Sequence, residues 1–205
     1  MIDTVARLIS QTHALVAADA YRSFTPDRAK VHALAAAGLE VLRQFPPLRG
    51  PCVLMSAMWA SRWQLLERTP VYVVAGALLI GSERVFGNEN TLFDGGTIFS
   101  KSNPYWDGHC WLAFGNYLAD ISIFRTAYSD CTPRILAEHV VKRFGLGRGL
   151  LLATERDAAN AGLNYRPQYV LTDNQIAELC IGARSIIEKP QIESLEVPDD
   201  GGYGR

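Results

Sequence analysis

Apolar residues in the first third of the chain recur at the three- and four-residue spacing of amphipathic helices. Residues 2–20 carry one such stripe. A Thr-Pro-Asp sequence at 25–27 then gives a helix-start signal, and the Ala- and Leu-rich segment 29–45 that follows ends at a pair of prolines. Residues 52–67 are apolar and aromatic, with no Gly or Pro in the interior. The pattern therefore predicts three helices, and the third is expected to be buried.

The pattern then changes to β-branched and alternating apolar positions, which are typical of strands. Residues 71–80 are apolar, lie between a proline and a glycine, and predict a buried strand. Residues 110–114 and 117–124 predict a hairpin whose two strands are joined by a Gly-Asn turn. Residues 82–107 are rich in Gly, Asn, Ser and Asp but also hold several aromatic side chains. They indicate a long loop or a small hairpin excursion.

The last third of the chain mixes helices with strands. The expected elements are a helix over 133–144, strands over 148–155 and 165–171, and a final helix over 173–187. The sequence therefore predicts an α+β fold in which N-terminal helices pack on a small antiparallel β-sheet. Residues 1–187 are expected to form a single domain, and residues 188–205 a mobile C-terminal tail.

Composition narrows the class of protein. The chain has 205 residues, of which 48% are hydrophobic and 20% charged, with a net charge of −1. These values are typical of a soluble globular domain, and a net charge near zero gives no field that favours nucleic acid or anionic lipid. No stretch reaches the ~18 apolar residues of a membrane span, and the N-terminus lacks the pattern of a secretory signal. Neither a nucleic-acid nor a membrane partner is expected.

The cysteines are sparse and widely spaced, at positions 52, 110, 131 and 180, with no CxxC pair. This usage is typical of a reduced protein in the cytoplasm. Cys131 and His139 are too loosely spaced to form a zinc signature, so no metal site is predicted. The glycines at 145, 147 and 149 follow a helix rather than a strand, which argues against phosphate binding. No cofactor is therefore expected.

Cys52 stands at the start of a predicted helix, where free N–H groups and the positive end of the helix dipole favour a thiolate. Pro51 suits the entry to such a helix, and Gly50 allows the backbone to approach a substrate closely. The same N–H groups can receive the oxyanion of a tetrahedral intermediate. Gln44 or Gln64 is a candidate side-chain donor beside them. The alternative is that Cys52 is a small buried residue at a helix start.

His109 and Asp120 are expected to meet across the predicted hairpin. A two-residue turn places Phe114 opposite Tyr117 and Trp111 opposite Asp120. Side chains alternate along a strand, so His109 shares a face with Trp111 and lies diagonally next to Asp120, with a Cβ separation of roughly 7 Å or less. A carboxylate there can accept a hydrogen bond from the imidazole and stabilise its charged form. The alternative is a histidine on an edge strand beside an unrelated aspartate.

Other titratable residues are weaker candidates. Cys110 is expected to point to the face opposite His109, which makes it a poor rival nucleophile. His13, His32 and His139 lie on predicted helices with no matching thiol or carboxylate pattern. They are interpreted as surface residues or as satisfied core residues.

The segments GPC-VLMSAMWASRWQLL, TPVYVVAGALLIG, GHCWLAFG and NYLADIS, within residues 50–124, resemble the transglutaminase-like branch of the papain-like cysteine hydrolase superfamily. In that superfamily a cysteine opens a helix, a histidine in an H-x-W-like strand follows, and an aspartate in the next strand completes a triad. The resemblance implies a papain/transglutaminase-like fold and a Cys52–His109–Asp120 triad. The chain departs from the pattern in the insertion over 82–107 and in the residues flanking Cys52.

The resemblance implies a cysteine-dependent acyl-transfer enzyme, foremost a protease or amidase acting on a peptide or protein substrate through an acyl-enzyme. Bacterial members of this size resemble proteases that trim ribosomal peptide precursors. Other branches are amidases, deamidases, arylamine N-acetyltransferases and crosslinking enzymes. Candidate substrate-binding residues are Trp106, Asp107, Trp111 and Gln44. A transferase that passes the acyl group to an amine, a non-catalytic peptide-binding module on the same scaffold, and an effector acting through the acidic segment 193–200 stay open as alternatives.

Overall fold

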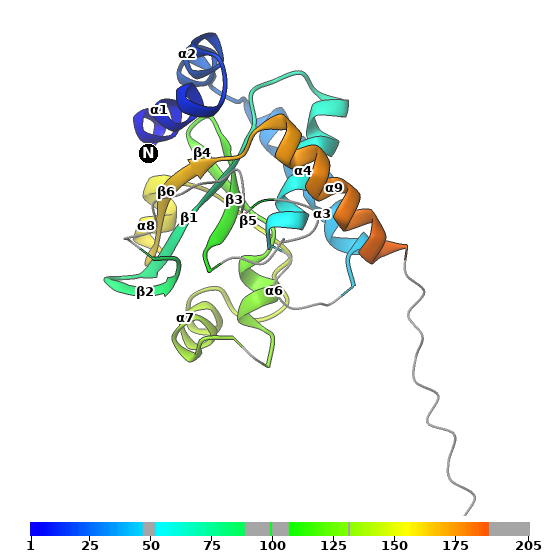
Figure 1. The fold of residues 1–205 in the computed structure, drawn as a ribbon. Helices are drawn as coiled ribbons and strands as arrows, with labels where there is room; N and C mark the ends of the chain where they lie inside the picture. The colour runs from blue at the N-terminus through cyan, green and yellow to red at the C-terminus, as the bar shows by residue number, and fades with distance from the viewer. Residues whose placement is uncertain (47–51, 89–98, 100–106, 131, 189–205) are drawn as a thin grey trace, which may run out of the picture.

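The computed structural model describes residues 1–46, 52–88, 99, 107–130 and 132–188. These residues form eight helices around a six-stranded sheet (Figure 1). The helices are α1 (Ile2–Thr12), α2 (Leu15–Ser23), α3 (Arg28–Gln44), α4 (Cys52–Leu66), α6 (Ile123–Ala127), α7 (Arg134–Phe144), α8 (Glu155–Asn160) and α9 (Asp173–Ile187). The strands are β1 (Tyr72–Ile80), β2 (Glu83–Phe86), β3 (His109–Phe114), β4 (Tyr117–Asp120), β5 (Leu151–Thr154) and β6 (Leu163–Val170).

The sheet is antiparallel in every pair of neighbouring strands. Its order is β2-β1-β3-β4-β5, and β6 pairs with β1 as well. β1 is therefore the strand on which three others assemble, and its near-continuous burial follows from that position. The predicted mixed fold with an antiparallel sheet is confirmed at this level.

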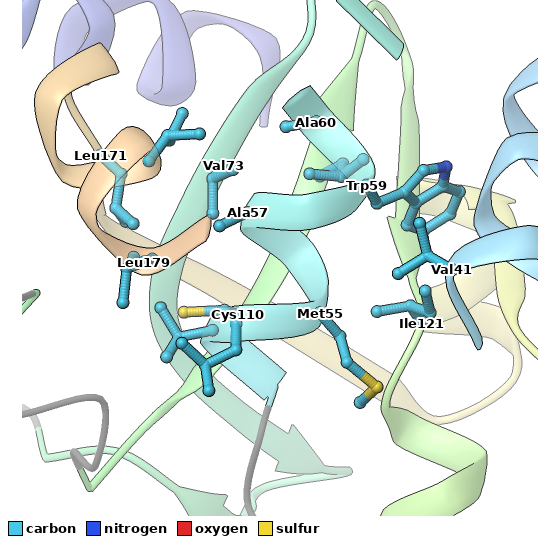
Figure 2. Packing of buried hydrophobic residues seen from close by; sticks show 14 of the residues in the cluster. Val41, Met55, Ala57, Trp59, Ala60, Val73, Cys110, Ile121, Leu171 and Leu179 are labelled. Carbon is cyan, nitrogen blue, oxygen red and sulfur yellow. The ribbon is translucent and has the colours of Figure 1, made fainter. Parts of the chain in front are cut away.

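Helices cover both faces of the sheet, and alternate side chains of each strand enter two separate cores. On one face α3, α4 and α9 pack against Val73 of β1 and Cys110 of β3, around the buried Trp59 (Figure 2). On the other face α1, α2, α6 and α7 pack against Val74 and Trp111, the next residues of the same two strands. This period-two division is what a sheet buried on both sides requires.

The N-terminal stripe forms two helices where the sequence predicted one over residues 2–20. The chain is extended at His13 and Ala14, between α1 and α2. Leu15 and Val16 beyond the break are 66% and 74% exposed. The inward-facing stripe therefore ends with α1, and α2 turns a different face to the core.

The other predicted helices are confirmed within a few residues. α3 begins after Asp27, whose Oδ1 accepts a 2.8 Å hydrogen bond from the Lys30 N–H. α4 covers the buried helix expected over 52–67, and α9 begins with a capping box between Thr172 and Gln175. Short polar side chains that accept from N–H groups of the first turn explain why the starts of α3 and α9 could be located from sequence.

Two predicted segments differ from the structure near the hairpin. The strand expected over 117–124 stops at Asp120, and the short helix α6 begins at Ile123. The excursion expected over 82–107 begins with β2, which folds back on β1. Most of that excursion, like the predicted tail from 189 onward, lies outside the described residues. No helix in the described part of the chain is long and apolar enough to cross a membrane.

Candidate active site

The β3–β4 hairpin has the register that a two-residue turn imposes. Gly115 opens the turn with a φ of 58°, a conformation that glycine adopts without strain. Phe114 pairs with Tyr117, as predicted, and Leu112 pairs with Ala119. His109 and Asp120 consequently reach the same face, where His109 Nε2 lies 2.5 Å from Asp120 Oδ2. Both side chains are buried, which strengthens the interaction by excluding water.

Asp120 is fixed at its second oxygen by the start of α6. Asp120 Oδ1 accepts hydrogen bonds from the Ser122 N–H at 2.9 Å, the Ser122 hydroxyl at 3.1 Å and the Ile123 N–H at 3.0 Å. Burial alone would raise the pKa of the Asp120 carboxyl. The charge of His109 and the hydrogen bonds from His109, Tyr165 and Ser122 outweigh burial and lower that pKa below its ordinary value. Asp120 is therefore an anchored, ionised carboxylate.

Cys52 is the first residue of α4, as predicted, and its side chain is partly exposed. Hydrogen bonding to the Cys110 thiol lowers the pKa of Cys52 most, burial opposes this, and hydrogen bonding to His109 and its charge lower the pKa further. The net pKa lies well below the ordinary value of a thiol. One turn along the helix, the Ser56 hydroxyl donates to the Cys110 carbonyl at 3.3 Å. This bond fixes the first turns of α4 against the start of β3.

His109 carries the opposite shift. Burial alone would lower the pKa of His109, but the charge and hydrogen bond of Asp120, together with the Cys52 thiol, raise it to about 10. Since Nε2 faces Asp120, Nδ1 is the ring nitrogen left for Cys52. A raised imidazole pKa beside a lowered thiol pKa favours transfer of the proton from sulfur to nitrogen. The two shifts therefore favour a thiolate at Cys52 beside an imidazolium at His109.

Three aromatic rings surround the imidazole. Phe86 of β2 stacks on His109, with ring centroids 5.5 Å apart and planes inclined by 16°. Trp111 lies 6.4 Å from His109 and Tyr165 lies 6.1 Å from it. Faces of aromatic rings attract cations and exclude water. The rings therefore favour the charged form of His109 and shield its bond to Asp120.

Tyr165 is a site residue that sequence reasoning missed. It lies on β6, and its hydroxyl donates a 2.8 Å hydrogen bond to Asp120 Oδ2, the oxygen that also faces His109. β6 reaches the site because it pairs with β1, which also pairs with β3. A tyrosine in a strand carries no local sign of such a contact. Only the pairing of strands more than 80 residues apart in sequence could have revealed it.

Cys110 was expected to face away from His109, and the two cores agree with this. Cys110 belongs to the core under α4, whereas Trp111 belongs to the core on the opposite face. Burial and the neighbouring Cys52 raise the pKa of Cys110 well above its ordinary value, so it stays a thiol. Its contact with Cys52 was not predicted, because the position of α4 over the sheet is a tertiary feature.

The predicted substrate-binding residues have different locations. Asp107 is exposed two residues before the start of β3, and Gln44 is exposed at the last position of α3. Trp111 has no exposed surface and packs edge-on against Tyr165 at 5.0 Å, so it contributes to the core rather than to a surface a substrate could touch. Trp106 lies outside the described residues.

Gln64 is wrong as a donor beside Cys52. It lies twelve residues further along α4, which places it about 18 Å away along the helix axis. There it lines an open polar pocket together with His13 and Tyr72.

Arg125 of α6 ties the site to the helix that precedes Cys52. Its Nη2 donates to the Leu42 carbonyl at 2.9 Å, and its Nη1 donates to the carbonyls of Phe45 at 3.2 Å and Pro46 at 3.0 Å. These carbonyls lie at the C-terminal end of α3, where backbone acceptors lack helical partners. The planar guanidinium can satisfy several of them at once. Arg125 therefore ties α6 to the C-terminal end of α3.

Metal-binding clusters are absent from the described part of the chain: no three His, Cys, Asp or Glu side chains gather there as a metal site would require. Two histidines outside the site, His139 and His13, have local partners. The ring of His139 bonds the Ala161 carbonyl through Nε2 at 2.8 Å, and the ring of His13 lies 2.9 Å from the Thr12 hydroxyl.

Comparisons of the chain with family models, with curated proteins and with solved structures give no match. The resemblance drawn from sequence motifs therefore stays a prediction.

Proposed function

We propose that this protein is a cysteine-dependent acyl-transfer enzyme of papain/transglutaminase-like fold, with Cys52 as nucleophile, His109 as acid and base, and Asp120 as the residue that orients His109. The favoured activity is that of a protease or amidase on a peptide or protein substrate. The observation that carries the proposal is the unbroken chain of interactions from a low-pKa thiol through an imidazole to a buried carboxylate.

The first half of the reaction follows from the protonation states. The Cys52 thiolate attacks the carbonyl carbon of an amide, and the carbonyl oxygen becomes an oxyanion. N–H groups in the first turn of α4 lack helical partners and lie at the positive end of the helix, so they are suited to stabilise this oxyanion. As the C–N bond breaks, the imidazolium of His109 gives its proton to the leaving amine. The product is a thioester on Cys52 and a neutral imidazole.

The second half regenerates the thiolate. Neutral His109 takes a proton from water, and the resulting hydroxide attacks the thioester carbonyl. The carboxylic acid leaves, and Cys52 is again a thiolate beside an imidazolium. When an amine takes the place of water, the same steps give a new amide, so hydrolase and transferase activity share one set of residues.

The proposal is tested with p-nitrophenyl acetate, an activated ester that acylates reactive thiols. The wild-type protein is expected to release a burst of p-nitrophenol and to gain one acetyl group on Cys52, located by peptide mass spectrometry. Cys52→Ala should abolish both. His109→Gln should slow acylation by about 10²–10⁴-fold, the usual contribution of a general base, because Cys52 loses the group that takes its proton.

Cys180 provides the matched control. It is a buried cysteine whose pKa is raised by burial, and it lies on α9 away from His109. Cys180→Ala should leave the burst unchanged. Acetylation of Cys180 as fast as of Cys52, or an unchanged rate in His109→Gln, would contradict the proposal. A peptide-binding module without catalysis would show neither a burst nor any effect of His109→Gln.

A further inference from the structure

We propose that Tyr165 is a positioning residue that acts on His109 through Asp120, and that its hydroxyl keeps the imidazolium acidic enough to protonate a poor leaving group. This inference rests on the proposed acyl-transfer function and deepens it. It assigns a fourth side chain to the site, contributed by β6.

The two carboxylate oxygens of Asp120 accept hydrogen bonds from different groups. Oδ1 accepts three hydrogen bonds from Ser122 and Ile123, which hold the carboxylate in place. Oδ2 accepts from both His109, at 2.5 Å, and Tyr165, at 2.8 Å. Because Oδ1 is already anchored, the Tyr165 hydroxyl is not needed to orient the carboxylate. The Tyr165 hydroxyl instead reduces the negative charge on Oδ2 that is available to His109.

Tyr165 can only donate at this position. A carboxylate oxygen is an acceptor, and burial together with the charge of Asp120 raises the pKa of Tyr165 well above its ordinary value. The hydroxyl therefore stays protonated throughout the range in which a cysteine enzyme works. It shares the negative charge of Oδ2, and a carboxylate that shares its charge with a second donor is a weaker base.

The weaker base has a consequence for His109. The more strongly Asp120 attracts the proton on Nε2, the more stable the imidazolium is and the less readily His109 releases its other proton from Nδ1. The remaining titratable groups that face the pair in the described structure are Cys52 on α4 and Cys110 on β3. Cys52 raises the pKa of His109, and Cys110 stays a neutral thiol. Among these titratable side chains, Tyr165 is the one that weakens the attraction of Asp120 for the proton on Nε2.

The ring of Tyr165 has a separate, packing role that Tyr165→Phe would keep. The ring lies 5.0 Å from Trp111 in an edge-to-face arrangement. Tyr165→Phe removes the hydroxyl alone. Tyr169 offers a matched control on the same strand, since its hydroxyl donates to Gln175 Oε1 at 3.1 Å and its ring packs against the core on the other face of the sheet.

The direct test is proton NMR of the hydrogen between His109 and Asp120 in the whole protein. A short, buried imidazolium–carboxylate bond gives a resonance at unusually low field, and His109→Gln identifies it by abolishing it. Tyr165→Phe should move this resonance further downfield, because Oδ2 attracts the proton more strongly. Tyr169→Phe should leave it in place. An unmoved resonance in Tyr165→Phe, or an equal shift in both variants, would overturn the inference.

The kinetic test compares two leaving groups. Acylation by p-nitrophenyl acetate needs little help from an acid, whereas acylation by an acyl anilide needs His109 to protonate the departing amine. Tyr165→Phe should slow the anilide about tenfold, the effect of roughly one unit in the acidity of His109, and leave the ester within about twofold. Equal effects on both substrates would overturn the inference.

Failure of the two proposals can be told apart. If the wild-type protein forms no acyl-enzyme with either compound, the proposed function fails, while the NMR resonance still reports whether Tyr165 tunes the His109–Asp120 pair. If the acyl-enzyme forms normally and Tyr165→Phe leaves the chemical shift of this hydrogen unchanged, only the role of Tyr165 fails.

Discussion

At the scale of single residues, the lowered pKa of Cys52 depends on two adjacent positions of β3. His109 and Cys110 point to opposite faces of the sheet, yet both interact with the Cys52 thiol, because α4 begins where β3 begins. His109 supplies charge, and Cys110 supplies the hydrogen bond that lowers the pKa of Cys52 most. An imidazole and a thiol, adjacent in sequence, therefore both lower the pKa of Cys52.

Removing the Cys110 thiol should raise the pKa of Cys52. In Cys110→Ala the thiolate loses its largest stabilising interaction, whereas Cys110→Ser keeps a donor of similar shape. We expect alkylation of Cys52 by iodoacetamide at pH 6 to slow by about tenfold in Cys110→Ala, in proportion to the lost thiolate. The change in Cys110→Ser should be smaller. The measurement is the alkylation rate between pH 5 and 10, followed by peptide mass spectrometry.

Cys180→Ala is the control for removing a buried sulfur atom, since Cys180 lies on α9 in the same core. Its pH profile should match that of the wild-type protein. Identical profiles for Cys110→Ala and the wild type would show that Cys110 does not stabilise the thiolate.

Residues of the site differ in how far the sequence revealed them. The spacing of His109 and Asp120 about a Gly-Asn turn was enough to predict their shared face, since strand parity and turn length are local rules. The helix start at Cys52 was predicted from Pro51 and the apolar run that follows it, and the role of Cys52 partly from the family resemblance. Tyr165 and the Cys110 contact could not be predicted, because each depends on how distant elements pack.

At the scale of elements, the close approach of β6 to β1 brings Tyr165 into the site. Gly76 of β1 lies opposite His109 in the ladder with β3, at a point where the pairing of β1 with β6 shifts register. A Cβ at Gly76 would lie 2.0 Å from the Arg166 carbonyl oxygen and 2.9 Å from Trp111 Cη2. Absence of a side chain at this one position allows the three strands to meet.

Gly76→Ala should therefore be strongly destabilising. The clash is with backbone, which cannot rotate away, so β6 must move from β1 and take Tyr165 with it. We expect a loss of about 1–3 kcal/mol in the free energy of unfolding, the cost of overpacking a tight site. The measurement is urea denaturation followed by circular dichroism.

Gly149→Ala is the matched control. The added methyl group meets only the flexible ends of Leu39 at 3.0 Å and Leu42 at 3.5 Å. Its free energy of unfolding should change by well under half of the loss in Gly76→Ala. Equal losses in the two variants would contradict the close approach of β6 at Gly76.

Element boundaries were predictable where a cap or turn residue marks them. Asp27 and Thr172 mark the starts of α3 and α9. The break between α1 and α2 carries neither Gly nor Pro, so the apolar stripe seemed continuous. The start of α6 depends on the Asp120 side chain accepting from Ser122 and Ile123, and this arrangement becomes visible only in three dimensions.

At the scale of the whole molecule, the site joins the two cores. Cys52 belongs to the helix that packs on one face of the sheet, whereas Trp111 and Tyr165 belong to the core on the other face. His109 can serve both because it is the first residue of β3, at the end of the sheet. The ion pair therefore exists only when both layers of helices are packed, and its protonation is coupled to folding.

Each shifted group contributes to stability over its own pH range. The pKa of His109 rises from 6.5 to about 10, so its contribution is complete below pH 6.5 and is lost as the pH rises toward 10. The pKa of Cys52 lies well below its ordinary 9.0, so its contribution is complete above pH 9 and is lost as the pH falls. The lowered pKa of Asp120 adds stability that is lost only on acidification below its ordinary 3.8.

Between pH 6.5 and 9 the contributions of His109 and Cys52 oppose each other. In the unfolded chain the pair holds one proton in this range, on the thiol, and in the folded protein it also holds one, on the imidazole. The free energy of unfolding should therefore be nearly independent of pH in this range, as far as the Cys52–His109 pair is concerned.

In Cys52→Ala the imidazolium of the folded protein is the one member of the pair that holds a proton. The free energy of unfolding should therefore fall with rising pH from about 6.5, with a slope of up to about 1.4 kcal/mol per pH unit. Urea denaturation of both proteins under reducing conditions, at intervals from pH 6 to 10, measures the two curves. Parallel curves would mean that folding does not transfer the proton from Cys52 to His109. Divergence above pH 6.5 would identify the thiolate–imidazolium pair by a measurement that needs no substrate.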